Sequence, residues 1–114
     1  MSERLKKINA LIKKELGTII LKELSWPESI LVTITEVETL KDLKESRVFI
    51  AVFPEKEMKK VLKILKGEVY NLQQFLNKRI KIKFVPRIKF FEDKRLKETQ
   101  KVDEILNKIE KDWN

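Results

Sequence analysis

Residues 79–93 read RIKIKFVPRIKFFED and carry the clearest structural signal in the chain. One parity holds Ile80, Ile82, Phe84, Ile88 and Phe90, and the other holds Lys81, Lys83, Arg87 and Lys89. Because successive side chains of a strand point to opposite faces, this alternation predicts a strand over 80–90 with a core face and a cationic face. Pro86 lacks an amide donor, so the strand is expected at a sheet edge or with a bulge at that residue.

Two further strands are predicted earlier in the chain. β-Branched side chains alternate from Ile30 to Thr35, and a second alternating run extends from Ser46 to Phe53. Residues 40–43 read as the connection between them. A connection this short joins antiparallel neighbours, so these two strands are expected to form a hairpin-like pair.

Apolar residues at helical spacing predict a first helix over 3–24, with Ser2 as its N-cap and Pro27 beyond its end. A second helical stripe follows Pro54, which suits a first helical position. This stripe crosses Gly67 without changing phase. The pattern therefore predicts either one helix bent at Gly67 or two helices joined there by a tight kink.

After a turn at residues 92–94, a last apolar stripe predicts a helix over 98–112. We expect a single domain over residues 1–114, with residues 94–114 as a C-terminal extension whose helix is partly mobile. The stripe leaves open whether this helix docks on the domain or meets a partner. A monomer is expected, because no long heptad seam is visible.

The expected fold is α+β, in the order helix, strand, strand, helix, kink, helix, strand and C-terminal helix, with a three-stranded sheet packed against the helices. This is the order of a type II KH-like domain. An ordinary KH domain clamps nucleotides with a GXXG loop between two helices. The chain has two glycines, Gly17 and Gly67, so the loop cannot exist and Gly67 alone occupies its place.

The charge balance points to a polyanionic partner. The chain has 26 Lys and Arg against 18 Asp and Glu, a formal net charge of +8. Such a surface attracts phosphates and releases their counterions on binding. With this charge and no GXXG loop, binding to an RNA surface by shape and phosphate contact is favoured over reading of single bases.

The missing residue types exclude most enzyme chemistry. The chain contains no His and no Cys, so it has no ordinary neutral-pH base, no thiol nucleophile and no nitrogen or sulfur zinc ligand. We expect no catalysis, no metal and no cofactor. The acidic pair Glu92-Asp93 is interpreted as a solvated turn. Without a signal-like or membrane-spanning apolar stretch, a cytoplasmic location away from membranes is expected.

The chain resembles the ribosome-binding factor A family, which assists assembly of the bacterial small ribosomal subunit, from about Arg4 to Ile109. The resemblance is carried by Arg4, Ile8 and Leu16, by residues 34–37, 42–43 and 48–52, by Gly67, and most specifically by residues 79–93. In that family an Ala-x-Gly kink replaces the nucleotide-binding loop. Here the kink reads Leu65-Lys66-Gly67, so the glycine matches and the small residue does not.

The resemblance implies binding to the free small subunit and its ribosomal RNA, help in maturation of the RNA 5′ end, release before translation and a role in growth in the cold. Charge and resemblance together give the expected RNA-binding residues: Lys63, Lys66, Gly67, Lys78, Arg79, Lys81, Lys83, Arg87 and Lys89. Lys7 and Lys14 form a second candidate patch. Phe90 is expected in the core, whereas Phe91 is undecided between the core and base stacking.

Two other kinds of binding remain as alternatives. A generic KH-like domain for single-stranded RNA would bind short oligonucleotides tightly, whereas an assembly factor would prefer the folded subunit. A membrane-surface or protein-interaction module would use the basic first helix. The core needs the apolar stripe of that helix, because the sheet would otherwise have one bare face.

Overall fold

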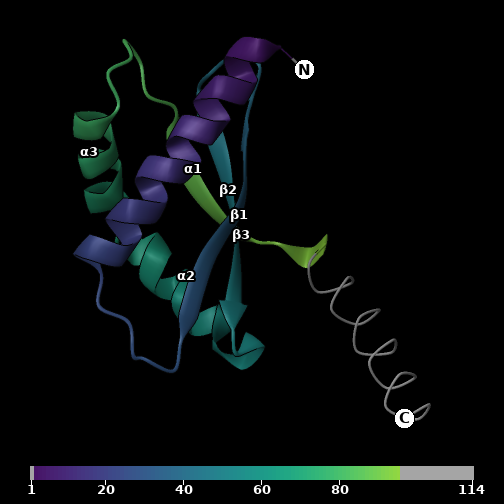
Figure 1. Ribbon diagram of the computed structural model, residues 1–114, viewed down its shortest axis with the longest axis vertical. Coiled ribbons are helices and arrows are strands. Elements are labelled where there is room, and N and C mark those ends of the chain that lie inside the picture. The colour runs from purple at the N-terminus through teal and green to yellow at the C-terminus, as the bar shows by residue number, and fades with distance from the viewer. Residues whose placement is uncertain (1, 96–114) are drawn as a thin grey trace, which may run out of the picture.

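The computed structural model describes residues 2–95, in which a layer of helices covers one face of a three-stranded sheet (Figure 1). The helices are α1 (Glu3–Glu23), α2 (Met58–Gly67) and α3 (Val69–Arg79), with a short 3-10 helix, η1 (Glu55–Glu57), before α2. The strands are β1 (Leu31–Thr39), β2 (Glu45–Phe53) and β3 (Arg87–Glu92). The predicted α+β order is confirmed. The helix expected over 98–112 lies outside the described residues.

Helix α1 forms where the apolar spacing predicts it. The Ser2 hydroxyl accepts a hydrogen bond from the Leu5 amide over 3.2 Å, which satisfies one of the free amides at the helix start. Ile12 and Leu16 are fully buried, and the helix packs against β1 and α3. The lysines of α1 are therefore left on its outer side.

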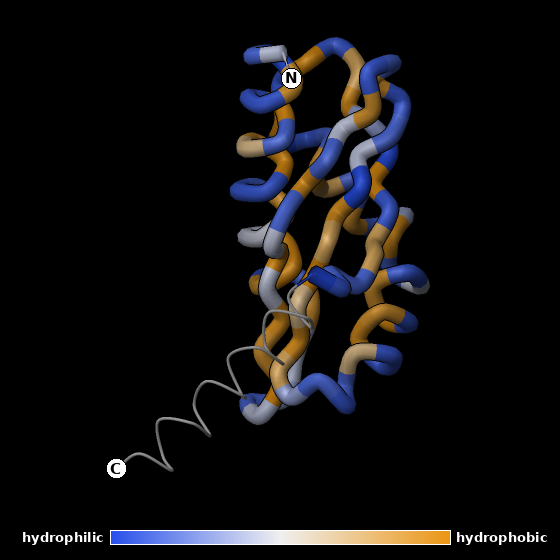
Figure 2. The backbone as a smooth tube through the Cα atoms, turned by 90° about the vertical axis from the view of Figure 1, so that its right-hand side faces the viewer, coloured by the Kyte–Doolittle hydropathy of each residue, from blue (hydrophilic) through white to orange (hydrophobic). Residues whose placement is uncertain are grey.

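The sheet has the order β1-β2-β3, with β1 antiparallel and β3 parallel to β2. The antiparallel pair and the edge position of the third strand are both as predicted. Along β2, alternate side chains from Ser46 to Val52 are buried beneath the helices. Figure 2 views the sheet from its other side, which no described helix covers.

The third strand is shorter than the alternation predicts, because it begins at Arg87 and residues 80–86 form a connection. Its partner β2 begins at Glu45, opposite Arg87, so residues 80–86 have no paired strand beside them. The prediction of a continuous core face over residues 80–90 is therefore also wrong. Ile80 is buried, but Phe84 is 76% exposed. Phe90 is buried as expected, and Phe91 is 38% exposed.

Strand β1 continues past the predicted alternation through a bulge between Ile34 and Glu36. The bulge changes which parity faces the helices, so Val37 and Thr39 are buried beyond it. It also places the Thr35 hydroxyl 2.6 Å from the Asp93 carboxylate, to which it donates a hydrogen bond.

The interpretation of Glu92-Asp93 as a solvated turn is wrong for Asp93, because the Asp93 side chain is buried. Besides Thr35, the carboxylate accepts a hydrogen bond from the Arg95 amide over 3.0 Å, and the Asp93 amide donates to the Ile50 carbonyl over 2.9 Å. Arg95 also pairs with Glu36. The end of β3 is thereby tied across β2 to the bulge of β1.

At Gly67 the chain forms two separate helices joined by a kink. Helix α2 ends at Gly67, Glu68 adopts φ −98° and ψ 3°, and α3 begins at Val69. The second predicted arrangement, two helices joined by a tight kink, is therefore confirmed. Leu65, which stands where the resembling family has a small residue, is fully buried in the core. Gly67 itself is exposed.

Asp93 is expected to make folding stability depend on acid pH. Burial raises the pKa of Asp93, but hydrogen bonds from Thr35 and Arg95 outweigh burial and hold the pKa below its ordinary value of 3.8. Such a group stabilises the fold above its unfolded-state pKa and loses that contribution as the pH falls through the folded-state pKa. Asp93→Asn should cost about 1–3 kcal/mol at pH 7. It should also flatten the fall in stability between about pH 5 and pH 2 in urea unfolding.

Glu92→Gln is the matched control, because it removes a neighbouring charge outside this hydrogen-bonded group. An Asp93→Asn protein whose acid-pH profile equals that of the wild type would show that the buried carboxylate has no such role.

Gly67→Ala is expected to stabilise the protein. Gly67 has no positive φ, and a Cβ at this position would meet nothing within 4 Å. At such a site alanine lowers the conformational entropy of the unfolded chain, which is worth about 0.4–1 kcal/mol. Thermal unfolding measures the change, with Gly17→Ala, equally free of contacts, as the comparison. A loss of stability at position 67 alone would contradict the unstrained junction seen here.

Candidate nucleic-acid interface

All the cations expected to bind RNA are on the protein surface, but they do not form one patch. Lys63 and Lys66 lie on the outer side of α2, next to Lys59 and Lys60. Lys78 and Arg79 end α3, and Lys81 follows in the connection. The remaining expected residues, Lys83, Arg87 and Lys89, lie in a groove at the end of the molecule where α1 begins.

This groove, called the basic groove below, is an open cavity of about 1310 Å³ formed by three separate segments. They are the start of α1, the turn between β1 and β2, and residues 82–89. Figure 1 shows the start of α1 and the connection before β3 at the same end of the fold. Its cations are Arg4, Lys7, Lys44, Lys83, Arg87 and Lys89, against the two acids Asp42 and Glu45.

The wall of the basic groove is fixed by backbone contacts. The Gln73 side chain donates to the Pro86 carbonyl over 3.1 Å and accepts from the Ile88 amide over 2.9 Å. The Arg87 amide donates to the Lys44 carbonyl over 3.0 Å. These bonds hold the start of β3 between α3 and the turn before β2, so the cations there are carried on a rigid backbone.

Apolar residues also line the basic groove, among its charged residues. Ile8, Leu11, Ile82, Val85 and Pro86 all line the basic groove. Ile82 and Val85 also pack against the core, and Pro86 is buried. The groove therefore offers apolar surface at its base and positive charge at its rim, a combination suited to a ligand with both phosphates and rings.

Ion pairs partly neutralise two of the expected cations. Lys89 Nζ lies 2.9 Å from Glu45 Oε1, and Arg79 Nε lies 2.7 Å from Glu15 Oε2. Hydrogen bonds from Lys89 and Arg47 hold the pKa of Glu45 below its ordinary value, so Glu45 is ionised at neutral pH. Exposed pairs of this kind contribute only about 0–1 kcal/mol, so a phosphate can replace the carboxylate at little cost.

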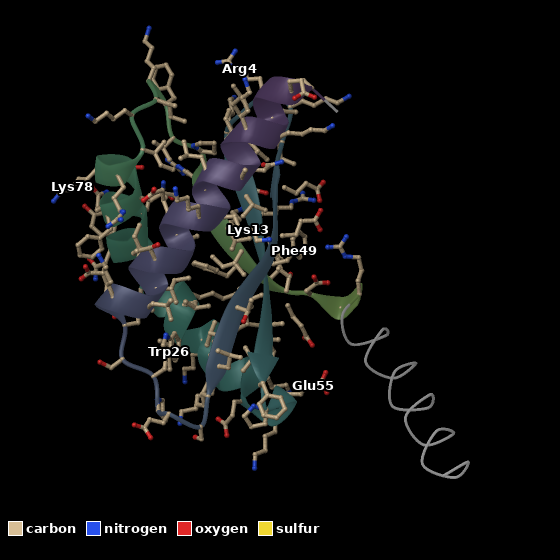
Figure 3. All side chains as sticks on the ribbon, viewed as in Figure 1. Arg4, Lys13, Trp26, Phe49, Glu55 and Lys78 are labelled. Carbon is tan, nitrogen blue, oxygen red and sulfur yellow. The ribbon has the colours of Figure 1, made fainter. Side chains whose placement is uncertain are left out.

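The groove also contains residues that sequence reasoning did not bring together. Arg4 contributes to the family resemblance but to no predicted RNA-binding patch, and Lys44 belongs to no predicted site. Lys7 lies in the groove, whereas its expected companion Lys14 lies in a different hollow beside β1. Figure 3 shows Arg4 at the beginning of α1 and Lys78 apart from it on α3. The spacing of Arg4 and Lys7 does place both on one helix face, which was the available signal.

Within residues 2–95, no helix is both long and apolar enough to span a bilayer.

Comparison with known proteins identifies the family. The family described as "Ribosome-binding factor A" matches residues 4–106. Ribosome-binding factor A of Halothermothrix orenii is 30% identical over 111 residues, covering 96% of this chain and 91% of that protein. The crystal structure of ribosome-binding factor A from Thermus thermophilus superposes with a TM-score of 0.67 at 26% identity, covering 77% of this chain and 94% of that one.

A second Thermus thermophilus structure is a ribosome-binding factor A homology model fitted into a cryo-EM map of its complex with 30S. It superposes with a TM-score of 0.63 at 28% identity, covering 73% of this chain and 88% of that one. The family match spans all three segments that form the basic groove, together with the kink between α2 and α3. The chain belongs to the ribosome-binding factor A family.

Proposed function

We propose that this protein is a cytoplasmic ribosome assembly factor that binds the free small ribosomal subunit by contacts to its RNA. The observation that carries the proposal is the basic groove, where six cations from three segments converge against two acids. The relative from Thermus thermophilus that was fitted into a complex with 30S has the same fold, which supports the same partner here.

Phosphate contact supplies the driving force in this proposal. Each lysine or arginine that neutralises a phosphate releases condensed counterions, so the affinity falls steeply as salt rises. The lysines of α2 add a second cationic surface outside the groove. Two surfaces on one rigid domain favour a folded RNA particle, because only a folded particle presents phosphates to both at fixed positions.

The helix junction argues against a single-strand clamp of the KH type. Helices α2 and α3 are separated by one residue, Glu68, so no loop projects between them to hold a strand. Gly67 is the single glycine there. The generic single-strand alternative therefore lacks the element that ordinary KH domains use.

The finer part of the proposal is that binding assists maturation of the RNA 5′ end and ends before translation begins. The protein would act by binding and not by catalysis. The chain lacks His and Cys, and in the Glu92-Asp93 pair the Asp93 carboxylate already accepts hydrogen bonds from Thr35 and Arg95.

Co-sedimentation with isolated small subunits, large subunits and whole ribosomes tests the proposal. Selective retention by small subunits is expected, with the affinity falling roughly a thousandfold between 50 and 200 mM salt if about six phosphates are neutralised. Lys63→Glu combined with Lys66→Glu should weaken retention by about tenfold or more and lower the salt slope by about 1–2. Lys83→Glu combined with Arg87→Glu should act in the same way.

The matched control is Lys22→Glu combined with Lys94→Glu, which changes the net charge equally at two exposed lysines that belong neither to the groove lining nor to α2. Equal retention by all three particles, or equal weakening by the control pair, would reduce the interaction to general attraction between opposite charges.

A further inference from the structure

The most exposed aromatic ring of the described residues lies on the wall of the basic groove. Phe84 is 76% exposed and lines the groove, although the residues around it are held inward. Ile82 and Val85 pack against the core, and Ile80 and Pro86 are buried. Phe84 therefore projects into solvent from a connection whose other apolar side chains are buried or packed against the core. Its exposed ring is available to stack with another ring.

Hydrogen bonds anchor the chain on both sides of Phe84. Before it, the Ile80 amide donates to the Leu76 carbonyl over 3.0 Å at the end of α3. After it, Gln73 holds the Pro86 carbonyl and the Arg87 amide is bound to Lys44. A ligand ring that meets Phe84 consequently meets a surface that needs little ordering.

Positive charge surrounds this ring. Lys83 Nζ lies 5.7 Å from the centroid of the Phe84 ring, within reach of a cation–π contact. Arg4, Lys7 and Arg87 line the same groove. An aromatic platform beside several phosphate-binding cations is the combination that binds unpaired nucleotides, because a base stacks on the ring while the backbone phosphates meet the cations.

We propose that the basic groove binds an unpaired RNA segment, with one base stacked on Phe84 and the adjoining phosphates held by Arg4, Lys7, Lys83 and Arg87. The proposal rests on the proposed function and adds to it the kind of RNA that enters the groove. A paired base has both faces covered within the helix, so a duplex could offer phosphates but no face to Phe84. The lysines of α2 would meet phosphates of the folded particle elsewhere.

Small-subunit binding of Phe84→Leu across a salt series gives the first test. Leucine keeps an apolar side chain but removes the stacking surface, so retention should weaken by about tenfold, as for loss of one stacked base. The salt slope should not change, because no charge is lost. Lys83→Gln combined with Arg87→Gln should instead reduce the slope by about 1–2.

Tyr70→Leu is the matched control for that experiment. Tyr70 is a ring of similar exposure, 72%, on α3, and it is not part of the groove lining. Retention of Tyr70→Leu within about twofold of the wild type is expected. If Phe84→Leu binds the small subunit as tightly as the wild type does, the stacking role is wrong even though the proposed function stands.

A short oligoribonucleotide containing 2-aminopurine tests the groove without the ribosome. At low salt, stacking on Phe84 should quench the fluorescence of the unpaired analogue with the wild type and leave it unquenched with Phe84→Leu. The same strand in a duplex should show no protein-dependent quenching. Equal quenching by both proteins, or none by the wild type, would overturn the proposal. A wild type that quenches the oligonucleotide but ignores small subunits would instead reject the proposed function alone.

Discussion

The parallel pairing of β3 with β2 is the constraint on which the basic groove depends. Parallel strands begin at the same edge of a sheet, so the start of β3 must lie beside the turn that leads into β2. The chain reaches that edge only after α3, and the connection over residues 80–86 brings Lys83, Phe84 and Arg87 there. The first turns of α1 lie at the same end of the fold. Three segments that are distant in the sequence thus present their cations together.

In the rest of the fold, apolar side chains are buried between α1 and the sheet, and the lysines of α1 stay on the surface. Burial of Ile12, Leu16 and Val48 fixes α1 on the sheet and leaves its lysines outside. The other side of the sheet, where Phe49 is labelled in Figure 3, is stabilised differently. There the Phe49 ring lies 5.8 Å from Phe91 and 5.9 Å from the Arg95 guanidinium, which also pairs with Asp93. Near Phe49 the charges of Glu36, Asp93 and Arg95 pair with one another, whereas the groove carries more cations than acids.

Much of the fold could be predicted from local patterns, and the groove could not. Helical spacing placed α1 within one residue at its C-terminal end, and the β-branched alternation placed β1 and β2. Alternation failed over residues 80–86, because it reports which side chains are apolar and not whether a partner strand exists. For the same reason Phe84 was expected in the core and is exposed. The convergence of Lys7 and Arg87 depends on tertiary packing, which no spacing within one segment encodes. The assignment of individual lysines to RNA binding stays a prediction.

Site-directed crosslinking tests the central claim most directly, because the chain contains no cysteine and a single one can be introduced. Lys7→Cys places a photoreactive label in the basic groove, and Lys22→Cys places the same label on α1 outside the groove. After irradiation with small subunits, crosslinks to ribosomal RNA are expected from position 7 and not from position 22. Crosslinks from position 22 with none from position 7 would contradict the account, because RNA would then meet α1 away from the groove.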